Sequence, residues 1–451
     1  MADQLEDAYT IIGVTKAHRF IMLMILMGVF FDAIEQNAVG ITGPVLSKDW
    51  NLTSGHIGFL NTMTFTATAL GRILTGLIVD KYGRRSLLMI NLLIFGGGSL
   101  LCAISPNYTL LALARFVVGY GLGGEIAVAV VMASEYFGTK QRGTAVALIN
   151  VTAAGFGNML APAFGMLVYA IFPGQNGWRW VFALLFIPAI IVMYFRRHVP
   201  ESPRYLATQG KIEEANIVLS KIASGNLRTK ETSFTRYLVD TDATGIRKEK
   251  KGGWTDVLQG IYLKRTLLLI TAVACSYASQ ISMLTLMPNI LVQSGYEVQT
   301  SLWFTLVMQS GSLFGAICAA YFASKMPRKR TLTVAATIGC AAGLSMAFLA
   351  TSIVLIIVCA WIFNFAVIVL NTTIWLFAPE NYPTRIRGFG TSVILAAGSV
   401  SGGIFPLVSG TVFDAYGLSG MFAVLACLFV VLGITVQMCD ETFGKPLIEE
   451  E

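Results

Sequence analysis

Hydrophobic runs long enough to cross a lipid bilayer recur along almost the whole chain, separated by short polar stretches. A bilayer core about 30 Å thick is crossed by roughly 20 helical residues. Runs bounded by charged residues, Gly or Pro predict six spans in the first half of the chain, near residues 19–41, 57–79, 87–105, 108–131, 143–170 and 178–196. They predict six more in the second half, near residues 264–291, 301–323, 331–350, 353–377, 389–414 and 419–438. The pattern indicates an all-α membrane protein with twelve transmembrane helices.

One long polar stretch interrupts this pattern between the sixth and seventh spans. It divides the chain into an N-terminal segment (1–18), a six-helix bundle (19–196), a central loop (197–263), a second six-helix bundle (264–438) and a C-terminal tail (439–451). Within the loop, apolar residues of Lys211–Ile222 recur at helical spacing, which predicts a short amphipathic helix. The polar segment 228–253 is expected to be flexible.

Composition and charge agree with a membrane protein. The 451 residues are 55% hydrophobic and only 13% charged, which excludes an ordinary soluble domain. The formal net charge of +7 suggests nucleic acid binding at first, but most Lys and Arg residues gather in particular loops rather than on an amphipathic face, so we expect no nucleic acid partner. These loops contain Lys81, Arg84 and Arg85, then Lys140 and Arg142, then the central loop, then Lys325, Arg328, Lys329 and Arg330, then Arg385 and Arg387. The positive-inside rule places both termini and the central loop in the cytoplasm, and we expect a multi-pass protein of the plasma (inner) membrane, with the lipid bilayer as its surroundings.

An internal repeat relates the two halves. Glu135–Gly143 (EYFGTKQRG) and Glu380–Gly388 (ENYPTRIRG) share Glu, Arg and Gly at a constant offset of 245 residues. Gly157 and Pro162 in the following helix have counterparts in Gly402 and Pro406. The repeat indicates two pseudo-symmetric bundles from one duplicated ancestor, an architecture typical of transporters with a site between the halves.

The segment Gly76–Arg85 (GLIVDKYGRR) resembles the G-x-x-x-D-x-x-G-R-R signature between the second and third helices of the major facilitator superfamily. The resemblance extends to both halves through Arg115–Gly119 (RFVVG), the two repeated segments above, Pro200–Arg204 (PESPR) and Glu441–Lys445 (ETFGK). It implies the major facilitator fold and secondary transport by alternating access.

Within the superfamily, the motifs resemble the sugar-porter and metabolite:proton symporter branch. Asp32-Ala-Ile-Glu35 resembles the D-G-x-D acid pair of aromatic-acid:proton symporters, and Gly123-Gly124-Glu125 resembles the G-G-E of nicotinate-type transporters. The hexose-type Q-Q-x-x-G-x-N motif is absent from the seventh span, although Trp375 stands where sugar porters carry a tryptophan. The resemblance therefore implies uptake of an organic acid more than of a hexose.

Acidic and basic residues inside predicted spans are the candidates for proton coupling, because charge is costly in a bilayer. Asp32 and Glu35 are three residues apart and share a helix face. Glu35 and Arg115 each lie about 10 Å from the outer end of their spans, at a depth that permits an ion pair. An acid that gains or loses a proton as the arginine or substrate moves gives proton coupling, whereas a static pair that only joins two helices is the alternative. If a single acid cycles, the alignment with sugar porters favours Glu35 over Asp32.

Two further charged residues lie within spans. Glu125 is either a second protonation site or a carboxylate hydrogen-bonded to neighbouring backbone or hydroxyl groups. Arg72 either holds an anionic substrate or, as we expect, extends toward the cytoplasm.

Amide and aromatic side chains within spans are the candidate substrate contacts, because they orient a polar solute without a permanent charge. These are Asn150, Gln280, Gln309, Asn371 and Trp375. Each is equally suited to joining neighbouring helices.

The charged motif residues at the cytoplasmic ends of the spans carry opposite signs at one level. We expect a cytoplasmic gate of salt bridges that forms in the outward-open state, built from Asp80, Arg84, Arg85, Glu135, Arg142, Glu201, Arg204, Arg328, Glu380, Arg387 and Glu441. Exposed ion pairs contribute only about 0–1 kcal/mol each, so such a gate can open during transport. A role in topology alone explains the basic residues but not the acidic ones.

The sequence thus predicts a proton-coupled symporter that takes up a small metabolite, most simply an organic acid. The alternatives are a sugar or polyol transporter or an exporter of the same fold and, more remotely, a receptor or scaffold that does not transport. The sequence shows no nucleophile and base at usable spacing, no Walker A motif and no metal-ligand cluster, so we expect neither an enzyme nor an ATP-driven pump. We expect a monomer with a small-molecule substrate and protons as its partners, and the proton gradient in place of a cofactor.

Overall fold

The computed structural model describes residues 2–196, 198–227, 235–239, 257, 259–349 and 352–443. Two predicted gate side chains, Asp80 and Arg387, lie outside the described part, as does most of the segment 228–253.

Long helices dominate the described chain. In the first half these are α2 (Lys16–Asp49), α3 (Ser54–Tyr82), α4 (Arg84–Ile104), α5 (Tyr108–Tyr136), α6 (Thr139–Asn150), α7 (Asn158–Ile171) and α8 (Gly177–Arg196). A π-helical segment, η1 (Val151–Gly157), joins α6 to α7, so that the three form one continuous spanning helix. In the second half they are α11 (Gly260–Gln293), α12 (Val298–Lys325), α13 (Arg328–Phe348), α14 (Ile353–Glu380) and α15 (Thr384–Gln437).

Gly417 divides α15 into two spanning helices. Its backbone has φ 66° and ψ −161°, outside the helical region and accessible mainly to glycine. Among the described residues, eleven helices are long and apolar enough to cross a membrane. With α15 counted as two, the structure has the twelve spans that the sequence predicts.

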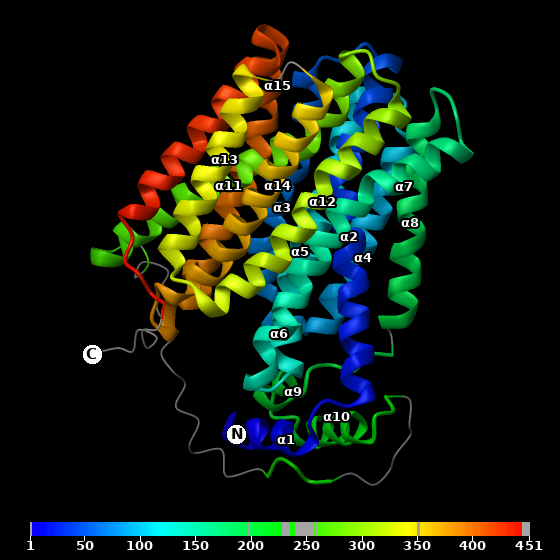
Figure 1. Ribbon diagram of the computed structural model, residues 1–451. Coiled ribbons are helices and arrows are strands. Elements are labelled where there is room, and N and C mark those ends of the chain that lie inside the picture. The colour runs from blue at the N-terminus through cyan, green and yellow to red at the C-terminus, as the bar shows by residue number, and fades with distance from the viewer. Residues whose placement is uncertain are drawn as a thin grey trace.

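The first and second halves meet mainly where α3 packs on α15, α2 on α11 and α7 on α12 (Figure 1). Within the first half, α5 packs between α3 and α4, and within the second half, α13 packs on α14 and α15. Glycines permit the closest of these approaches: a Cβ on Gly119 or Gly123 of α5 would overlap the backbone of α3.

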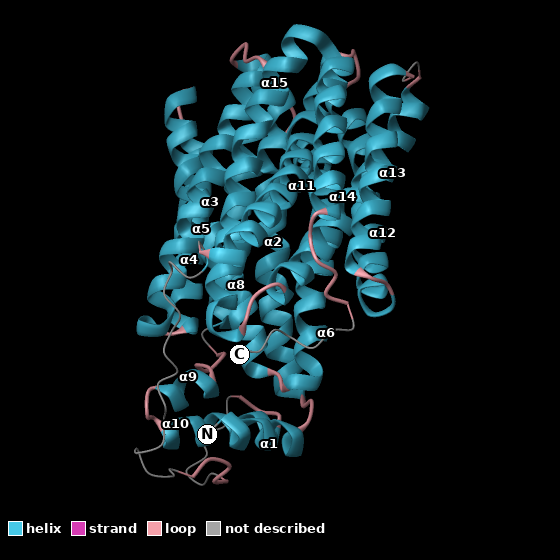
Figure 2. Cartoon of the chain, turned by 90° about the vertical axis from the view of Figure 1, so that its left-hand side faces the viewer, coloured by secondary structure: helices cyan, strands magenta, loops and turns pink. Residues whose placement is uncertain are grey.

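Three short helices lie together at one end of the bundle, hereafter the α1 end (Figures 1 and 2). They are α1 (Ala2–Ile12), α9 (Pro203–Thr208) and α10 (Ile212–Ser224). Leu5 and Tyr9 of α1 share a buried apolar cluster with Leu206 of α9 and Leu219 of α10. The α10 helix occupies the segment for which the sequence predicts an amphipathic helix, but α1 has no counterpart among the predicted elements.

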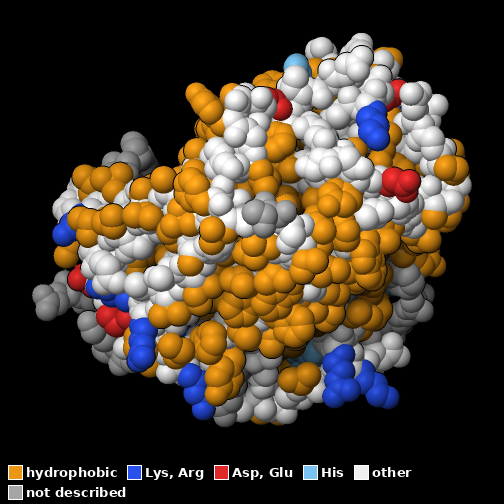
Figure 3. All heavy atoms as spheres, turned by 45° about the horizontal axis from the view of Figure 1, so that its top comes forward, with side chains coloured by type: hydrophobic (Ala, Val, Ile, Leu, Met, Phe, Trp, Pro, Cys, Tyr) orange, Lys and Arg blue, Asp and Glu red, His pale blue; other side chains and the backbone are white. Residues whose placement is uncertain are grey.

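The flank of the bundle is apolar. Figure 3 shows a broad, continuous area of hydrophobic side chains across the flank, and the charged side chains in view lie outside this area. Large apolar residues such as Leu77, Phe348 and Val354 are more than 60% exposed. Contiguous exposure of this kind is unfavourable in water and is typical of a lipid-facing surface.

Candidate functional site

A buried ion pair joins α2 to α5 in the first half. Arg115 Nη1 lies 2.5 Å from Glu35 Oε1, and both side chains are 0% exposed. Ser99 of α4 donates to Glu35 Oε2 at 2.6 Å, and Arg115 Nε donates to Thr64 Oγ1 of α3 at 3.1 Å. The pair that the sequence predicts from depth alone is therefore also hydrogen-bonded to two more helices.

A second buried pair lies between α5 and α8. Arg196 Nη2 is 2.7 Å from Glu125 Oε1, with side chains 4% and 0% exposed. Arg196 Nε, Arg196 Nη1 and Glu125 Oε2 have no hydrogen-bond partner among the described residues. The partner of Glu125 is thus an arginine rather than the backbone or hydroxyl groups considered from the sequence. The sequence gives little sign of this role, because Arg196 is the last residue of its predicted span, where an arginine usually marks topology.

Glycines make room for this second pair. A Cβ on Gly28 of α2 would overlap both the Arg196 guanidinium and the Glu125 carboxylate. A Cβ on Gly124 would overlap the Asn91 and Thr75 side chains of α4 and α3. The glycines beside Glu125 therefore bring α5 close enough to its neighbours to enclose the carboxylate.

Asp32 is the least satisfied acid of this group. It is 0% exposed, and within the described part of the chain neither of its carboxylate oxygens has a hydrogen-bond partner. The charged groups that act on it are Glu125, Arg196 and Glu35. Three carboxyl groups and two guanidinium groups thus share one buried region, hereafter the buried charge cluster (Asp32, Glu35, Arg115, Glu125 and Arg196), and its charges balance when one carboxyl group holds a proton.

Three of the predicted substrate contacts, Asn150 of α6, Gln280 of α11 and Asn371 of α14, meet beside α14. Asn371 Nδ2 donates to Gln280 Oε1 of α11 at 2.5 Å, and its Oδ1 accepts from Ser276 at 2.7 Å. Asn150 of α6 donates to Thr372 Oγ1 at 2.8 Å, a contact between the two halves. We call Asn150, Gln280, Asn371 and Thr372 the polar cluster.

The other two predicted contacts differ in position. Trp375, one helical turn from Asn371, donates to the Tyr277 hydroxyl at 3.0 Å. Gln309 of α12 is 2% exposed and accepts from Ser312 at 3.0 Å, within its own helix. The structure therefore brings Trp375 beside the polar cluster, whereas Gln309 has a hydrogen-bond partner within its own helix.

Arg72 of α3 reaches across to the second half. Its Nη1 donates to Ser399 Oγ of α15 at 2.8 Å and to the Leu395 carbonyl at 3.3 Å. The extended, cytoplasm-directed side chain that the sequence leads us to expect is thus replaced by one held at the interface of the two halves.

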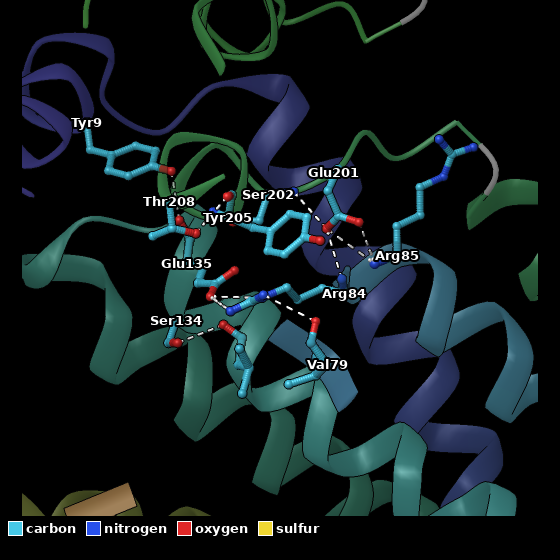
Figure 4. Close-up of polar contacts among 11 residues, drawn as sticks. Tyr9, Val79, Arg84, Arg85, Ser134, Glu135, Glu201, Ser202, Tyr205 and Thr208 are labelled. Atoms are coloured by element: carbon cyan, nitrogen blue, oxygen red, sulfur yellow. Dashed lines mark hydrogen bonds and ion pairs between the residues drawn. The ribbon is translucent and has the colours of Figure 1, made fainter. Parts of the chain in front are cut away.

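Charged motif residues form the same arrangement in each half at the α1 end. Arg84 Nη2 lies 2.9 Å from Glu135 Oε1, and Arg328 Nη2 lies 2.9 Å from Glu380 Oε1. Figure 4 shows the first of these arrangements, in which Glu201 also accepts from the backbone N–H groups of Arg84 and Arg85.

In the second half, Glu441 accepts likewise from the N–H groups of Arg328 and Lys329, both at 3.0 Å. Glu201 and Glu441 therefore place negative charge at the N-termini of α4 and α13, where the helix dipole favours it.

The environments of these two acids differ. Burial raises the pKa of Glu201 above its usual value, against the backbone N–H donors that lower it. At Glu441 burial also acts to raise the pKa, but the backbone N–H donors outweigh it and hold the pKa below its usual value.

Glu6 links the N-terminal helix to two predicted gate residues. Its Oε1 lies 2.9 Å from Arg142 Nη2 and 2.8 Å from Arg204 Nη2. Tyr9 of α1 donates to the Glu135 carbonyl at 2.7 Å. The partners of Arg142 and Arg204 thus include an acid that the sequence does not single out, because it lies outside the repeated motifs.

Contacts between the halves gather at the end opposite α1. The Asp414 carboxylate of α15 accepts from the Ser54 and Gly55 N–H groups at 3.2 and 3.0 Å, at the first turn of α3. Gln293 of α11 donates to Ser54 Oγ at 3.2 Å. Asn61 donates to Thr285 Oγ1 further along the same interface. The two halves are therefore held together at this end.

Comparison with known proteins settles the family. A profile described as the Major Facilitator Superfamily matches residues 25–406. The chain belongs to this superfamily. It is accordingly a multi-pass membrane transporter, and the Arg84–Glu135 pair joins two of the motifs that carry the family resemblance.

Two relatives match this chain over nearly its whole length. It is 30% identical over 436 residues, 96% of each chain, to the niacin transporter NiaP of Acinetobacter baylyi. It is 26% identical to the putative niacin/nicotinamide transporter NiaP of Bacillus subtilis, over 94% of this chain and 95% of the relative.

Solved structures share the fold. The xylose transporter XylE from E. coli, in a partially occluded inward-open conformation, superposes with a TM-score of 0.75 at 18% identity, covering 96% of this chain and 100% of that one. A D-xylose-proton symporter structure superposes with a TM-score of 0.73 at 19% identity, covering the same shares of the two chains.

Proposed function

We propose that this transporter couples the inward movement of protons to the uptake of a small organic acid. The observation that carries the proposal is the buried charge cluster, in which Asp32 has no hydrogen-bond partner among the described residues while Glu35 and Glu125 are each paired with an arginine. Ionisable groups buried at membrane depth are costly, and they mark ion and substrate pathways.

A proton on Asp32 balances the two arginines against the remaining two carboxylates. Loss of that proton leaves three negative charges against two positive ones, which favours rearrangement of the Glu35–Arg115 or Glu125–Arg196 pair. Because α2, α5 and α8 carry these residues, such a rearrangement changes the packing of the first half. We therefore assign proton binding to Asp32 in the present conformation and charge redistribution to Glu35, Arg115 and Glu125.

Alternating access requires two interfaces that open in turn. The hydrogen bonds of Asp414, Gln293 and Asn61 support a conformation closed at the end opposite α1. The loops rich in Lys and Arg lie at the α1 end, and such loops usually face the cytoplasm. We therefore propose that this conformation is open toward the cytoplasm and that both termini lie on the cytoplasmic side of the plasma membrane. The charged motif pairs, which lie within single halves here, would act as the cytoplasmic gate in the opposite conformation.

An organic acid is supported by the relatives named for niacin, which is itself a carboxylic acid. The polar cluster supplies hydrogen-bond donors and acceptors for the polar atoms of such a solute, and Trp375 offers an aromatic face beside them. We propose that Asn150, Gln280 and Asn371 contact the substrate within a single monomer.

The test is uptake of labelled nicotinate into proteoliposomes with an imposed pH gradient, followed by a screen of other acids and sugars. Wild type is expected to accumulate an acid above its external concentration and to lose this accumulation when a protonophore collapses the gradient. Asp32→Asn and Glu35→Gln are expected to abolish accumulation but to retain exchange of labelled for unlabelled substrate, because exchange needs no net proton movement. Glu214→Gln is the matched control, since its side chain is 54% exposed on α10.

Accumulation by Asp32→Asn and Glu35→Gln equal to wild type would contradict the coupling assignment. Gradient-driven uptake of sugars without acids would instead support the alternative of a sugar or polyol transporter. Net efflux under the same gradient would support an exporter.

A further inference from the structure

Arg72 is a membrane-depth arginine that has no acidic partner among the residues the structure describes. It lies ten residues before the end of α3 at Tyr82, about 15 Å along the helix. Its contacts are Ser399 Oγ and the Leu395 carbonyl, both neutral, and its buried Nε has no hydrogen-bond partner in the described part of the chain. A guanidinium ion is always charged, so neutral oxygens satisfy its hydrogens without balancing its charge.

The two almost fully buried arginines, in contrast, each have an acidic partner. Arg115 and Arg196 each lie within 2.7 Å of a glutamate oxygen, and both pairs are almost fully buried. Arg72 contacts Ser399 and the Leu395 carbonyl, and both carboxylate oxygens of Asp32 lack a partner in the described part of the chain, so Arg72 does not serve as the counterion of that acid. A deep arginine without a carboxylate partner is expected to have another role, because its burial costs several kcal/mol.

Arg72 is placed to bind a ligand that lies at the interface of the two halves. Its side chain is half-buried, and it leaves the first half to meet α15 of the second. Nη1 is the atom engaged by α15, and Nε is buried without a hydrogen-bond partner among the described residues, so the edge formed by Nε and Nη2 can take a ligand once the two halves move apart. That edge presents two parallel N–H donors, the geometry that binds a carboxylate through two hydrogen bonds.

We propose that Arg72 binds the carboxylate of the transported solute and selects acids over their neutral analogues. The inference rests on the proposed uptake of an organic acid and names the residue that recognises the acid group. Ser399 holds the guanidinium in place: its hydroxyl accepts from Nη1 and donates to the Leu395 carbonyl at 3.2 Å. Because Ser399 belongs to the second half, the bound acid lies at the interface that must separate during transport.

The test is binding to the purified protein in detergent, measured as ligand-dependent thermal stabilisation with acid and amide pairs of the same skeleton. The pairs are nicotinate with nicotinamide, benzoate with benzamide, and propionate with propionamide. Wild type is expected to bind at least one acid more tightly than its amide. In Arg72→Gln the acid is expected to bind at least about tenfold more weakly while amide binding is unchanged, since a charge-assisted contact is lost.

Two variants separate recognition from structure. Arg72→Lys keeps the charge without the planar fork, and is expected to keep a reduced preference for the acid. Ser399→Ala removes the contact between the halves but keeps the guanidinium, and is expected to retain the preference. If Arg72 served only to join α3 to α15, Arg72→Gln and Ser399→Ala would lower acid and amide binding equally.

Three results would overturn the inference: equal acid preference in Arg72→Gln and wild type, no acid preference in wild type, or equal stabilisation of wild type by chloride or phosphate. Proteoliposome transport provides a separate readout. Acid-selective binding through Arg72 without accumulation in vesicles would contradict the proposed function and leave the recognition role of Arg72 standing.

Discussion

Arg196 at the end of α8 lies 2.7 Å from Glu125 in the middle of α5, and Gly28 of α2 leaves the space that this ion pair fills. Three helices therefore meet at one pair of opposite charges with almost no exposure. Asp32, one helical turn beyond Gly28, borders the same region. The stability of the first half and the chemistry of its acids thus depend on the same few atoms.

The glycine at this position is expected to be essential for packing. In Gly28→Ala the new Cβ overlaps both charged groups, which is expected to destabilise the protein by about 1–3 kcal/mol, as for other overpacked cores. The measurement is the melting temperature of the purified protein. Gly97→Ala on α4 is the control, because nothing lies within 4 Å of its Cβ position, and it is expected to melt at or slightly above the wild-type temperature. Equal melting of Gly28→Ala and wild type would contradict the tight fit.

Removal of one member of the pair is expected to cost more than removal of both. Arg196→Gln leaves Glu125 buried beside Asp32 without its arginine, a loss of about 3–5 kcal/mol. The double variant Arg196→Gln, Glu125→Gln is expected to recover most of that stability, since no unpaired charge remains. A double-mutant cycle of melting free energies checks this, and additive losses would show that the two side chains do not interact.

Asp414 is expected to hold the end opposite α1 closed. Its carboxylate accepts from two N–H groups at the start of α3, a helix-capping contact supplied by the other half. Asp414→Ala is expected to weaken closure by about 0.5–2 kcal/mol, enough to raise the open population several-fold. Maleimide labelling of a Ser54→Cys reporter should accelerate accordingly, because Ser54 is 0% exposed in the closed arrangement. Asp440→Ala, at the α1 end, should leave the labelling rate unchanged.

The two pseudo-symmetric acids Glu201 and Glu441 are expected to respond to pH in opposite directions. A pKa held below its usual value of 4.5 means that Glu441 stabilises the fold above pH 4.5 and loses this effect as the pH falls through the lowered value. The melting difference between wild type and Glu441→Gln should therefore stay constant above pH 4.5 and shrink as the pH falls below 4.5 through the lowered pKa.

The raised pKa of Glu201 reverses the sign: its contribution is complete below pH 4.5 and declines as the pH rises through the raised value. Thermal melts of Glu201→Gln over the same range provide the comparison. Parallel pH profiles for the two variants would show that their environments are equivalent.

Glu6 is expected to keep α1 on the bundle. Glu6→Gln removes two ion pairs whose side chains are 31–33% exposed, each worth about 0–1 kcal/mol, so α1 should detach more often while the spanning helices keep their stability. Hydrogen exchange of the α1 amides should quicken, and high salt should produce the same effect in wild type. Glu214→Gln on α10 serves as the control, and unchanged exchange in Glu6→Gln would assign α1 docking to its apolar face alone.

The sequence by itself determined the number of spanning helices, the division into two related halves and the superfamily. These follow from hydrophobic run length, from the repeat of Glu135–Gly143 at Glu380–Gly388 and from the signature Gly76–Arg85, all of which are local patterns along the chain. It also brought Glu35 and Arg115 together, because both depths can be counted from helix ends at 1.5 Å per residue.

Only the tertiary structure decided which charges meet. Arg196 and Glu6 lie at segment ends, where charge is ordinary, and their partners Glu125 and Arg142 are remote in sequence. The contact of Arg72 with Ser399 depends on how α3 lies against α15 across the two halves. Hydrophobic periodicity fixes a helix and its depth, but the rotation of one helix against another depends on side-chain packing at each close approach, such as that at Gly28, and no local pattern encodes it.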